Sequence, residues 1–91
     1  MKVRVVYTTQ VKAALGISSE EPEVSAGCTV AKLMEELASC HPKVFTEFVL
    51  DGAQLRPSIL LFVGDRQTSL EDSIRLVEGD EVTIFAAISG G

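Results

Sequence analysis

Residues 76–91 read LVEGDEVTIFAAISGG, and this stretch contains the features that decide the fold. Val82 and Ile84 occupy every second position, and this period of two predicts a β-strand over residues 81–86. The turn Glu78-Gly79-Asp80 precedes the strand. The sequence therefore closes with a strand that leads directly into a short segment of small residues.

Three further strands are predicted upstream. Alternation over residues 2–8, with frequent β-branched residues, predicts the first strand. A polar turn over residues 18–22 and a short strand over residues 23–26 are expected to form a loose hairpin with it. Residues 58–63, SILLFV, are almost wholly apolar, which predicts a central strand.

One helix is clear in the sequence. Apolar residues recur at helical spacing between Val30 and Ala38, while charged residues occupy the other side. Thr29 is suited to cap the start of this helix. Pro42 ends it, because proline disfavours helix in the preceding residue and has no N–H to donate. Shorter helical segments are predicted at residues 9–16, 44–49 and 69–72.

The order of these elements predicts an α+β fold, with a four- to five-stranded mixed sheet packed on one main helix. If the first and last strands lie side by side at the centre of the sheet, the fold is a β-grasp. Periodicity alone leaves that pairing open. We expect a single domain over residues 1–85 and a flexible tail over residues 86–91.

Composition restricts the classes of function. The chain has 91 residues, the size of one small domain, with 13 acidic and 8 basic residues and a net charge of -5. This balance argues against a nucleic-acid partner, which needs a basic surface, and favours a basic protein partner. The sequence contains no apolar run of about 18 residues, so no membrane span is predicted. The N-terminal sequence MKVRVVYT lacks the apolar core of a signal peptide, so we expect a cytoplasmic protein.

Residues able to perform catalysis are few. His41 is the only histidine, and beside Pro42 we interpret it as an exposed helix-end residue without a catalytic partner. Cys28 and Cys40 flank the predicted helix about 18 Å apart, beyond disulfide reach, and we interpret both as small buried residues. Structural zinc needs four ligands in close pairs, so no metal site is predicted. We expect no bound cofactor and no enzymatic activity from the chain alone.

Acidic residues concentrate before and at the start of the last strand. They are Glu71, Asp72, Glu78, Asp80 and Glu81. This group is either a solvated surface or a docking patch for a basic partner. Glu78 and Asp80 are the candidates for partner binding.

The glycines at the end of the sequence have a physical use. Glycine has no Cβ and accepts almost any backbone conformation, so Gly90-Gly91 is a thin, flexible segment that ends in a carboxylate. Residues 86–91 extend at most about 20 Å. Attack of the carboxylate on the α-phosphate of ATP would make it an acyl donor. The alternative is an inert end that frays in solvent. The residues before the glycines are small or apolar, which suits insertion into another protein: Ala86, Ala87, Ile88 and Ser89.

The segment from Leu76 to Phe85, followed by the small-residue tail and Gly90-Gly91, resembles the closing motif of the MoaD/ThiS sulfur carriers, which are ubiquitin-like β-grasp proteins. The helix entry CTVAKL at residues 28–33 and the pair His41-Pro42 also match. Residues 56–59, RPSI, fit the longer MoaD-like members. The resemblance spans essentially the whole chain.

The resemblance implies a role for each tail residue. A MoeB/ThiF-like adenylyltransferase would adenylate Gly91 with ATP and Mg²⁺, and a persulfide donor would supply the sulfur of a thiocarboxylate. Gly90 would be the slender penultimate residue, and the residues from Phe85 to Ser89 would line the partner's groove. In MoaD-type members a MoaE-like large subunit uses this sulfur to make the dithiolene of molybdopterin.

The leading hypothesis is therefore the small subunit of molybdopterin synthase, in molybdenum cofactor biosynthesis. Phe45, Phe48 and the long connection from Cys40 to Arg56 favour it over minimal thiamine-type carriers. A carrier for thiamine, cysteine or tungsten-cofactor biosynthesis would use the same chemistry. The alternatives from other classes are a ubiquitin-like modifier, whose Gly91 forms an isopeptide bond with a lysine, and an interaction domain with an inert tail.

Overall fold

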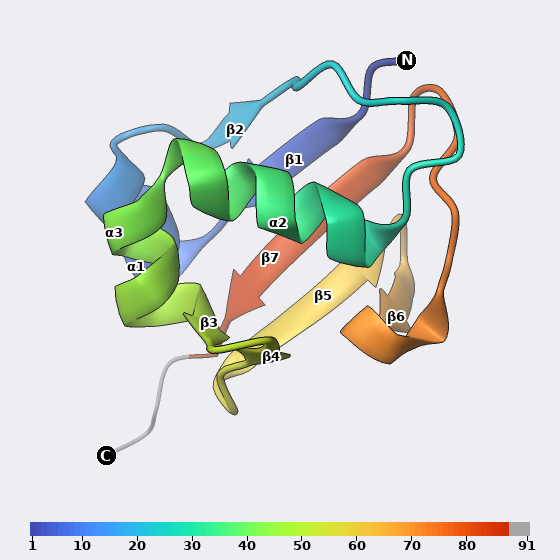
Figure 1. Cartoon of the computed structure of the whole chain (residues 1–91). Coiled ribbons are helices and arrows are strands. Elements are labelled where there is room, and N and C mark those ends of the chain that lie inside the picture. The colour runs from blue at the N-terminus through green and yellow to red at the C-terminus, as the bar shows by residue number, and fades with distance from the viewer. Residues whose placement is uncertain (88–91) are drawn as a thin grey trace.

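The computed structural model describes residues 1–87, and its centre is a five-stranded sheet in the order β2-β1-β7-β5-β6 (Figure 1). A separate two-stranded hairpin pairs β3 with β4. The predicted α+β class is confirmed. The strands are β1 (Arg4–Tyr7), β2 (Ser19–Glu20), β3 (Leu50–Asp51), β4 (Gln54–Leu55), β5 (Ile59–Val63), β6 (Arg66–Thr68) and β7 (Glu81–Ala86).

The two strands that meet at the centre come from opposite ends of the sequence. β1 and β7 pair in parallel, from Arg4 beside Glu81 to Tyr7 beside Ile84. The other pairings of the five-stranded sheet are antiparallel. This central pair, which periodicity left open, makes the fold a β-grasp with a mixed sheet. Residues 58–63 do supply an interior strand, β5, but β7 takes the middle position because it pairs with both β1 and β5.

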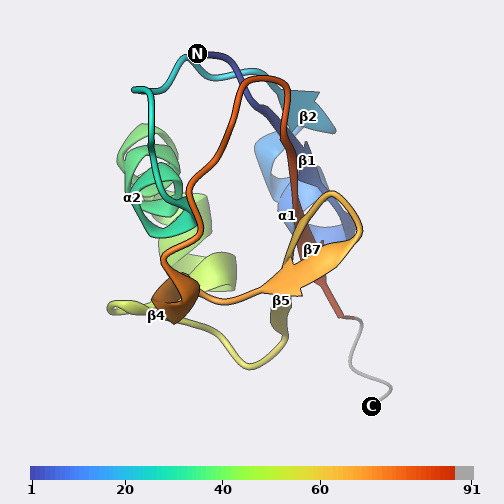
Figure 2. The same ribbon diagram turned by 90° about the vertical axis from the view of Figure 1, so that its right-hand side faces the viewer.

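The main helix, α2 (Val30–Cys40), lies across one face of the sheet (Figure 2). The Thr29 side chain accepts a hydrogen bond from the Lys32 N–H at 3.1 Å, so the predicted cap is confirmed. Leu33 and Leu37 on its inner face join sheet residues in one hydrophobic core. Each such fully buried side chain stabilises the fold by about 1.5–3 kcal/mol relative to exposure.

Short helical segments occur near the three predicted positions. They are α1 (Thr9–Leu15), α3 (Pro42–Val44) with the π-helical turn η1 (Phe45–Val49), and the 3-10 turn η2 (Leu70–Asp72). Proline has a fixed φ suited to a helix start, and Pro42 accordingly begins α3 after α2 has ended. Between residues 1 and 87, no helix combines the length and apolar character needed to cross a membrane.

The predicted strand at residues 23–26 is wrong in position. The segment that pairs with β1 is β2, at residues 19–20, and Glu23 makes only an isolated bridge with Lys2. Pro22 lies between them and has no N–H to donate to the ladder, so regular pairing stops there. The predicted hairpin with β1 forms, but its second strand lies at residues 19–20, earlier in the sequence than predicted.

The boundary between the domain and the tail also differs from the predicted one. The sequence places it after Phe85, whereas β7 continues through Ala86, which pairs with Ile59 and is 6% exposed. The next residue, Ala87, donates its N–H to the Ser58 carbonyl at 2.8 Å. The folded body therefore includes both alanines, and residues 88–91 of the predicted tail lie outside the described residues.

His41 has partners, so its interpretation as an isolated, exposed residue is wrong. Its Nε2 lies 2.9 Å from Oε2 of Glu20, and the same oxygen accepts a hydrogen bond from the Tyr7 hydroxyl. The imidazole is edge-on to the Tyr7 ring and stacks on Phe45, with centroids 6.5 and 6.3 Å apart. This cluster connects β1 and β2 to the corner between α2 and α3.

The Tyr7 cluster predicts a loss of stability at alkaline pH. Burial, followed by the hydrogen bond to Glu20 and its negative charge, raises the pKa of Tyr7 above its ordinary value of about 10. The folded protein therefore holds the phenol proton more tightly than the unfolded chain. This contribution to the free energy of unfolding is complete below about pH 10 and decreases by up to about 1.4 kcal/mol per pH unit above it.

We expect Tyr7→Phe to lack this part of the alkaline pH dependence in urea unfolding. Tyr7 is the only tyrosine and the chain has no tryptophan, so near-ultraviolet phenolate absorbance follows its titration directly. Ionisation near pH 10 in the folded protein would contradict the prediction.

Candidate functional site

The candidate site is the carboxyl end of β7, from which the sequence continues toward Gly90-Gly91. The strand lies between β1 and β5, so its direction is fixed on both sides. Figure 1 shows its end pointing away from the acidic turn that precedes it. The predicted site residues Ile88, Ser89, Gly90 and Gly91 are outside the described range. The structure therefore defines the base of the tail.

Two threonine hydroxyls hold this end of the strand. Oγ1 of Thr8 accepts a hydrogen bond from the Ala86 N–H at 3.1 Å and donates one to the Ile84 carbonyl at 3.0 Å. Oγ1 of Thr9 donates to the Ala86 carbonyl at 2.9 Å. On the other edge, the Ser58 carbonyl accepts the Ala87 N–H. The base of the tail is thus hydrogen-bonded on both sides.

The face of the sheet that α2 leaves uncovered is apolar near the tail. Phe85 is 41% exposed there, and its direct cross-strand neighbour on β5 is Leu60. Phe62 and Val6 lie on the same face, each beside Thr83 in the register, and are half-buried. We call Val6, Leu60, Phe62 and Phe85 the open apolar face. It adjoins the point from which the tail departs.

The sequence prediction identified Phe85 but missed the other residues of the open apolar face. The run SILLFV hides an alternation of burial: Ile59 and Leu61 are buried, whereas Leu60 and Phe62 are half-buried on the other side. A strand that is apolar on both faces could have indicated a second apolar surface. Only the position of α2 shows which face is covered and which is open to a partner. Conversely, Ala86 points into the core, so it cannot line a partner's groove as predicted while β7 is intact. Ala87 is exposed.

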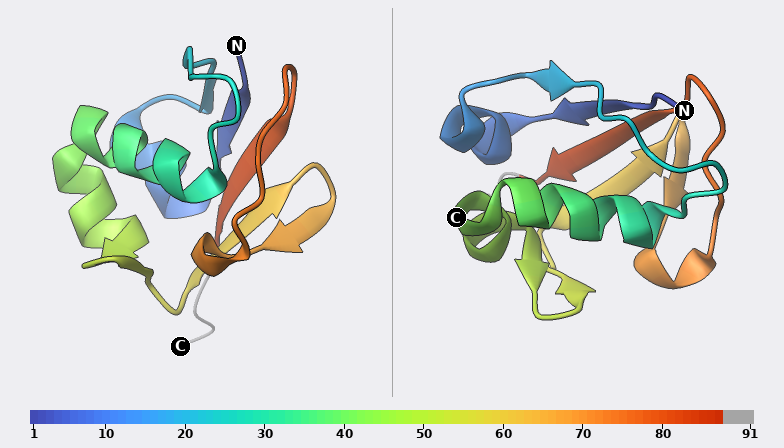
Figure 3. Two further views of the ribbon diagram at one scale, coloured as in Figure 1. Left: turned by 45° about the vertical axis from the view of Figure 1, so that its right-hand side comes forward. Right: turned by 45° about the horizontal axis from the view of Figure 1, so that its top comes forward.

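The acidic residues do not gather at the tail. Glu78 and Asp80 lie in the turn before β7, at the opposite end of this strand (Figure 3). The Asp80 carboxylate accepts the Val77 N–H at 2.9 Å, and that of Glu78 accepts the Lys2 N–H at 3.1 Å. In η2, hydrogen bonds from the Ser69 backbone and the Thr68 hydroxyl hold the pKa of Asp72 below its ordinary value. In the turn before β7 and in η2, carboxylates therefore accept hydrogen bonds that stabilise the local backbone.

The cysteines differ from each other. Cys28 is buried, as predicted, whereas Cys40 is exposed, and both are free thiols. Burial, with a contribution from Glu36, raises the pKa of the Cys28 thiol, so it stays protonated and unreactive at neutral pH. Residues 1–87 bring together no group of three or more His, Cys, Asp or Glu side chains able to hold a metal.

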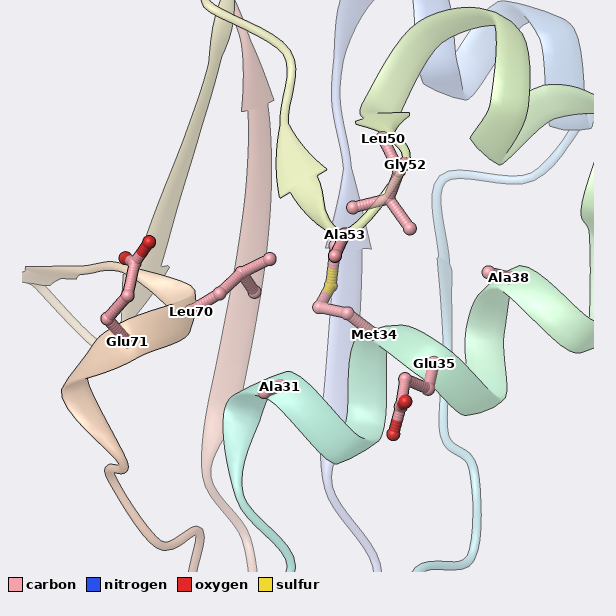
Figure 4. Close-up of a pocket in the computed structure, with 9 residues that line it drawn as sticks. All are labelled: Ala31, Met34, Glu35, Ala38, Leu50, Gly52, Ala53, Leu70 and Glu71. Carbon is pink, nitrogen blue, oxygen red and sulfur yellow. The ribbon is translucent and has the colours of Figure 1, made fainter.

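A hollow of about 630 Å³ lies on the other side of the molecule, between α2, the β3–β4 hairpin and η2 (Figure 4). Met34 and Leu70 point into it, and Glu35 and Glu71 are among its lining residues. It is separated from the open apolar face by the sheet. It therefore forms no part of the tail site.

Known structures share this architecture. SAMP1 from Haloferax volcanii superposes with a TM-score of 0.86 at 20% identity, covering 100% of both chains. A Pyrococcus furiosus protein assigned as molybdopterin converting factor, subunit 1, gives 0.78 at 29% identity, covering 97% of this chain and 99% of that one. A chain of the Amycolatopsis orientalis BexX/CysO complex gives 0.70 at 26% identity, covering 98% and 99%. Among curated proteins, none matches this sequence.

The ThiS family model matches residues 5–91. The match begins within β1 and includes both β7 and the terminal glycines. The resemblance seen in the sequence is thereby confirmed. This chain belongs to the ThiS family of ubiquitin-like sulfur-carrier and modifier proteins.

Proposed function

We propose that this chain is a sulfur carrier whose terminal glycine, Gly91, is adenylated and converted to a thiocarboxylate that donates sulfur. The observation that carries the proposal is the family match through Gly90-Gly91, at the end of a strand fixed on both sides. In this proposal the partner proteins supply the catalytic groups. The substrate is the chain's own C-terminus, which a partner's active site must receive.

The proposed chemistry has three steps. A carboxylate oxygen of Gly91 attacks the α-phosphorus of ATP, with Mg²⁺ on the activating enzyme, and pyrophosphate leaves. The terminal sulfur of a persulfide then attacks the acyl carbon and AMP leaves, which gives an acyl disulfide. A second thiolate cleaves the S–S bond, which releases the thiocarboxylate and leaves a disulfide on the donor side. Both cysteines are free thiols, which a reducing compartment preserves, and the proposed reaction consumes ATP. We therefore place this chemistry in the cytoplasm.

The residues of this chain act in binding. Gly90 keeps the penultimate position narrow, and Ile88 and Ser89 contact the walls of the partner's channel. The open apolar face beside the tail supplies the docking surface, with Phe85 at its exposed edge. The partners are a MoeB/ThiF-like adenylyltransferase, a persulfide donor and a MoaE-like large subunit.

We assign the sulfur to molybdopterin synthesis because the Pyrococcus furiosus relative, at 29% identity, is described as a molybdopterin converting factor subunit. A carrier for cysteine, thiamine or tungsten-cofactor synthesis remains the alternative within the same chemistry. Protein modification is the second candidate function, favoured by the overall structural likeness to SAMP1, a small archaeal modifier protein.

The first test is the mass of the protein produced together with its activating enzyme and sulfur donor. We expect the mass gain of one oxygen replaced by sulfur, located at Gly91. A variant that lacks Gly90 and Gly91 should fold cooperatively, because β7 ends at Ala86, but should gain no sulfur. Sulfur transfer in the truncated protein would refute the proposal. Linkage of Gly91 to lysines of other proteins, without thiocarboxylate, would favour the modifier.

The second test concerns the open apolar face. We expect Phe85→Asp to weaken binding of the adenylyltransferase by about tenfold or more, since a charge would enter a buried apolar contact. The free energy of unfolding should fall by about 1–2 kcal/mol, because Phe85 is only 41% exposed and aspartate is disfavoured in a strand, so binding is compared with folded protein. Val77→Asp is the matched control, at an apolar residue 61% exposed before β7. Isothermal calorimetry compares the affinities, and equal losses in both variants would contradict the assignment.

The third test concerns the acidic turn, whose distance from the tail allows only long-range steering of a basic partner. We expect Glu78→Gln, which keeps an acceptor for the Lys2 N–H, to slow association about twofold at low salt and less at high salt. Asp80 is left intact because it holds the Val77 N–H. Glu47→Gln, at an exposed position on η1, is the control. Stopped-flow association rates that do not differ between these variants would exclude steering by Glu78.

A further inference from the structure

After Ile84, the edge of β7 that faces β1 no longer has a strand to pair with. The parallel ladder with β1 ends where Tyr7 lies beside Ile84, because the chain then turns into α1. On the other edge, β7 continues to pair with β5 as far as Ala86. Backbone groups of Ala86 that point toward β1 would therefore have no strand to bond to.

Side chains replace the missing strand. The Thr8 hydroxyl accepts the Ala86 N–H and donates to the Ile84 carbonyl, while the Thr9 hydroxyl donates to the Ala86 carbonyl. The backbone at Thr9 has a φ of 44°, a conformation that is unfavourable for a β-branched residue. This unfavourable backbone conformation occurs where the hydroxyl reaches the last residue of the strand, and such outliers often mark functional positions.

We propose that Thr8 and Thr9 are positioning residues for the C-terminal tail: their hydroxyls keep β7 ordered through Ala86 and so set how many residues remain free to reach a partner's active site. This inference rests on the proposed function. With the two hydroxyls in place, residues 88–91 span at most about 14 Å beyond Ala87. Release of both alanines would add about 7 Å of chain.

A longer free segment weakens the reaction for an entropic reason. Every residue released from the strand must be ordered again when the tail enters a partner, and each costs conformational entropy. The Ser58 carbonyl still holds the Ala87 N–H from the β5 side. Loss of one hydroxyl should therefore raise the fraction of molecules in which the two alanines are released, without unfolding the rest of β7.

The test uses Thr8→Val and Thr9→Val, which remove each hydroxyl and keep the branched shape. Thr8→Ser and Thr9→Ser restore the hydroxyl. Two controls accompany them. Thr46→Val removes an exposed hydroxyl on η1, and Val11→Ala shortens a fully buried side chain of α1 while both threonine hydroxyls are kept. All variants are compared below their unfolding transitions, so that only folded protein is measured.

The first measurement is amide hydrogen exchange by NMR, which needs no partner. We expect the Ala86 amide to exchange about tenfold faster in Thr8→Val, with unchanged exchange at Val82. The second is ATP–pyrophosphate exchange with a ThiF/MoeB-type adenylyltransferase from the same organism. The KM for the carrier should rise about three- to tenfold in either valine variant while kcat stays constant, and the serine variants should restore it.

The outcomes separate the two proposals. Unchanged Ala86 exchange in Thr8→Val would overturn the holding role of the hydroxyls. Faster exchange with unchanged KM, or an equal rise of KM in Val11→Ala, would overturn their role in positioning. A wild-type protein that supports no ATP–pyrophosphate exchange would refute the proposed function and with it the positioning role, and hydrogen exchange would still decide whether the hydroxyls hold β7.

Discussion

The parallel pairing of β1 with β7 is the constraint on which the rest of the structure depends. It joins residues from opposite ends of the sequence, from Arg4 beside Glu81 to Tyr7 beside Ile84. The segments between them supply the remaining strands of the sheet and α2, which closes over one face. Because loop closure must precede such a long-range contact, the core under α2 has to offset its entropy. Only then is the departure point of the tail defined.

The sequence predicted the elements whose signals are local. Helical spacing and Thr29 identified α2, and period-two alternation identified β7. The sequence did not predict contacts between residues that are far apart along the chain. The network of Tyr7, Glu20 and His41 is one such case, because no sequence pattern indicates that these residues meet. The open apolar face was missed for a similar reason, because an apolar run does not reveal which side a helix will cover. Burial of Ala86 was missed because the threonines that extend β7 precede it by most of the chain.

The two faces of the sheet have different roles. One face of the sheet is used for stability, through the core beneath α2, and the other presents apolar side chains beside the tail. Carboxylates of the acidic group also secure turns at Val77 and Ser69. Under the proposed function the reactive group is the end of the chain's own backbone, and the partner provides the catalytic side chains.

The edges of the sheet have a further consequence. β2 contributes two residues and β6 three, so each side of the sheet offers only a few free backbone groups. Long, flat edge strands are templates for joining another sheet, and short ones discourage it. This protein is therefore protected against edge-to-edge self-association even though a strand lies at each side. Under the proposed function the chain offers its C-terminus to other proteins, and the short edge strands let it do so without edge-to-edge aggregation.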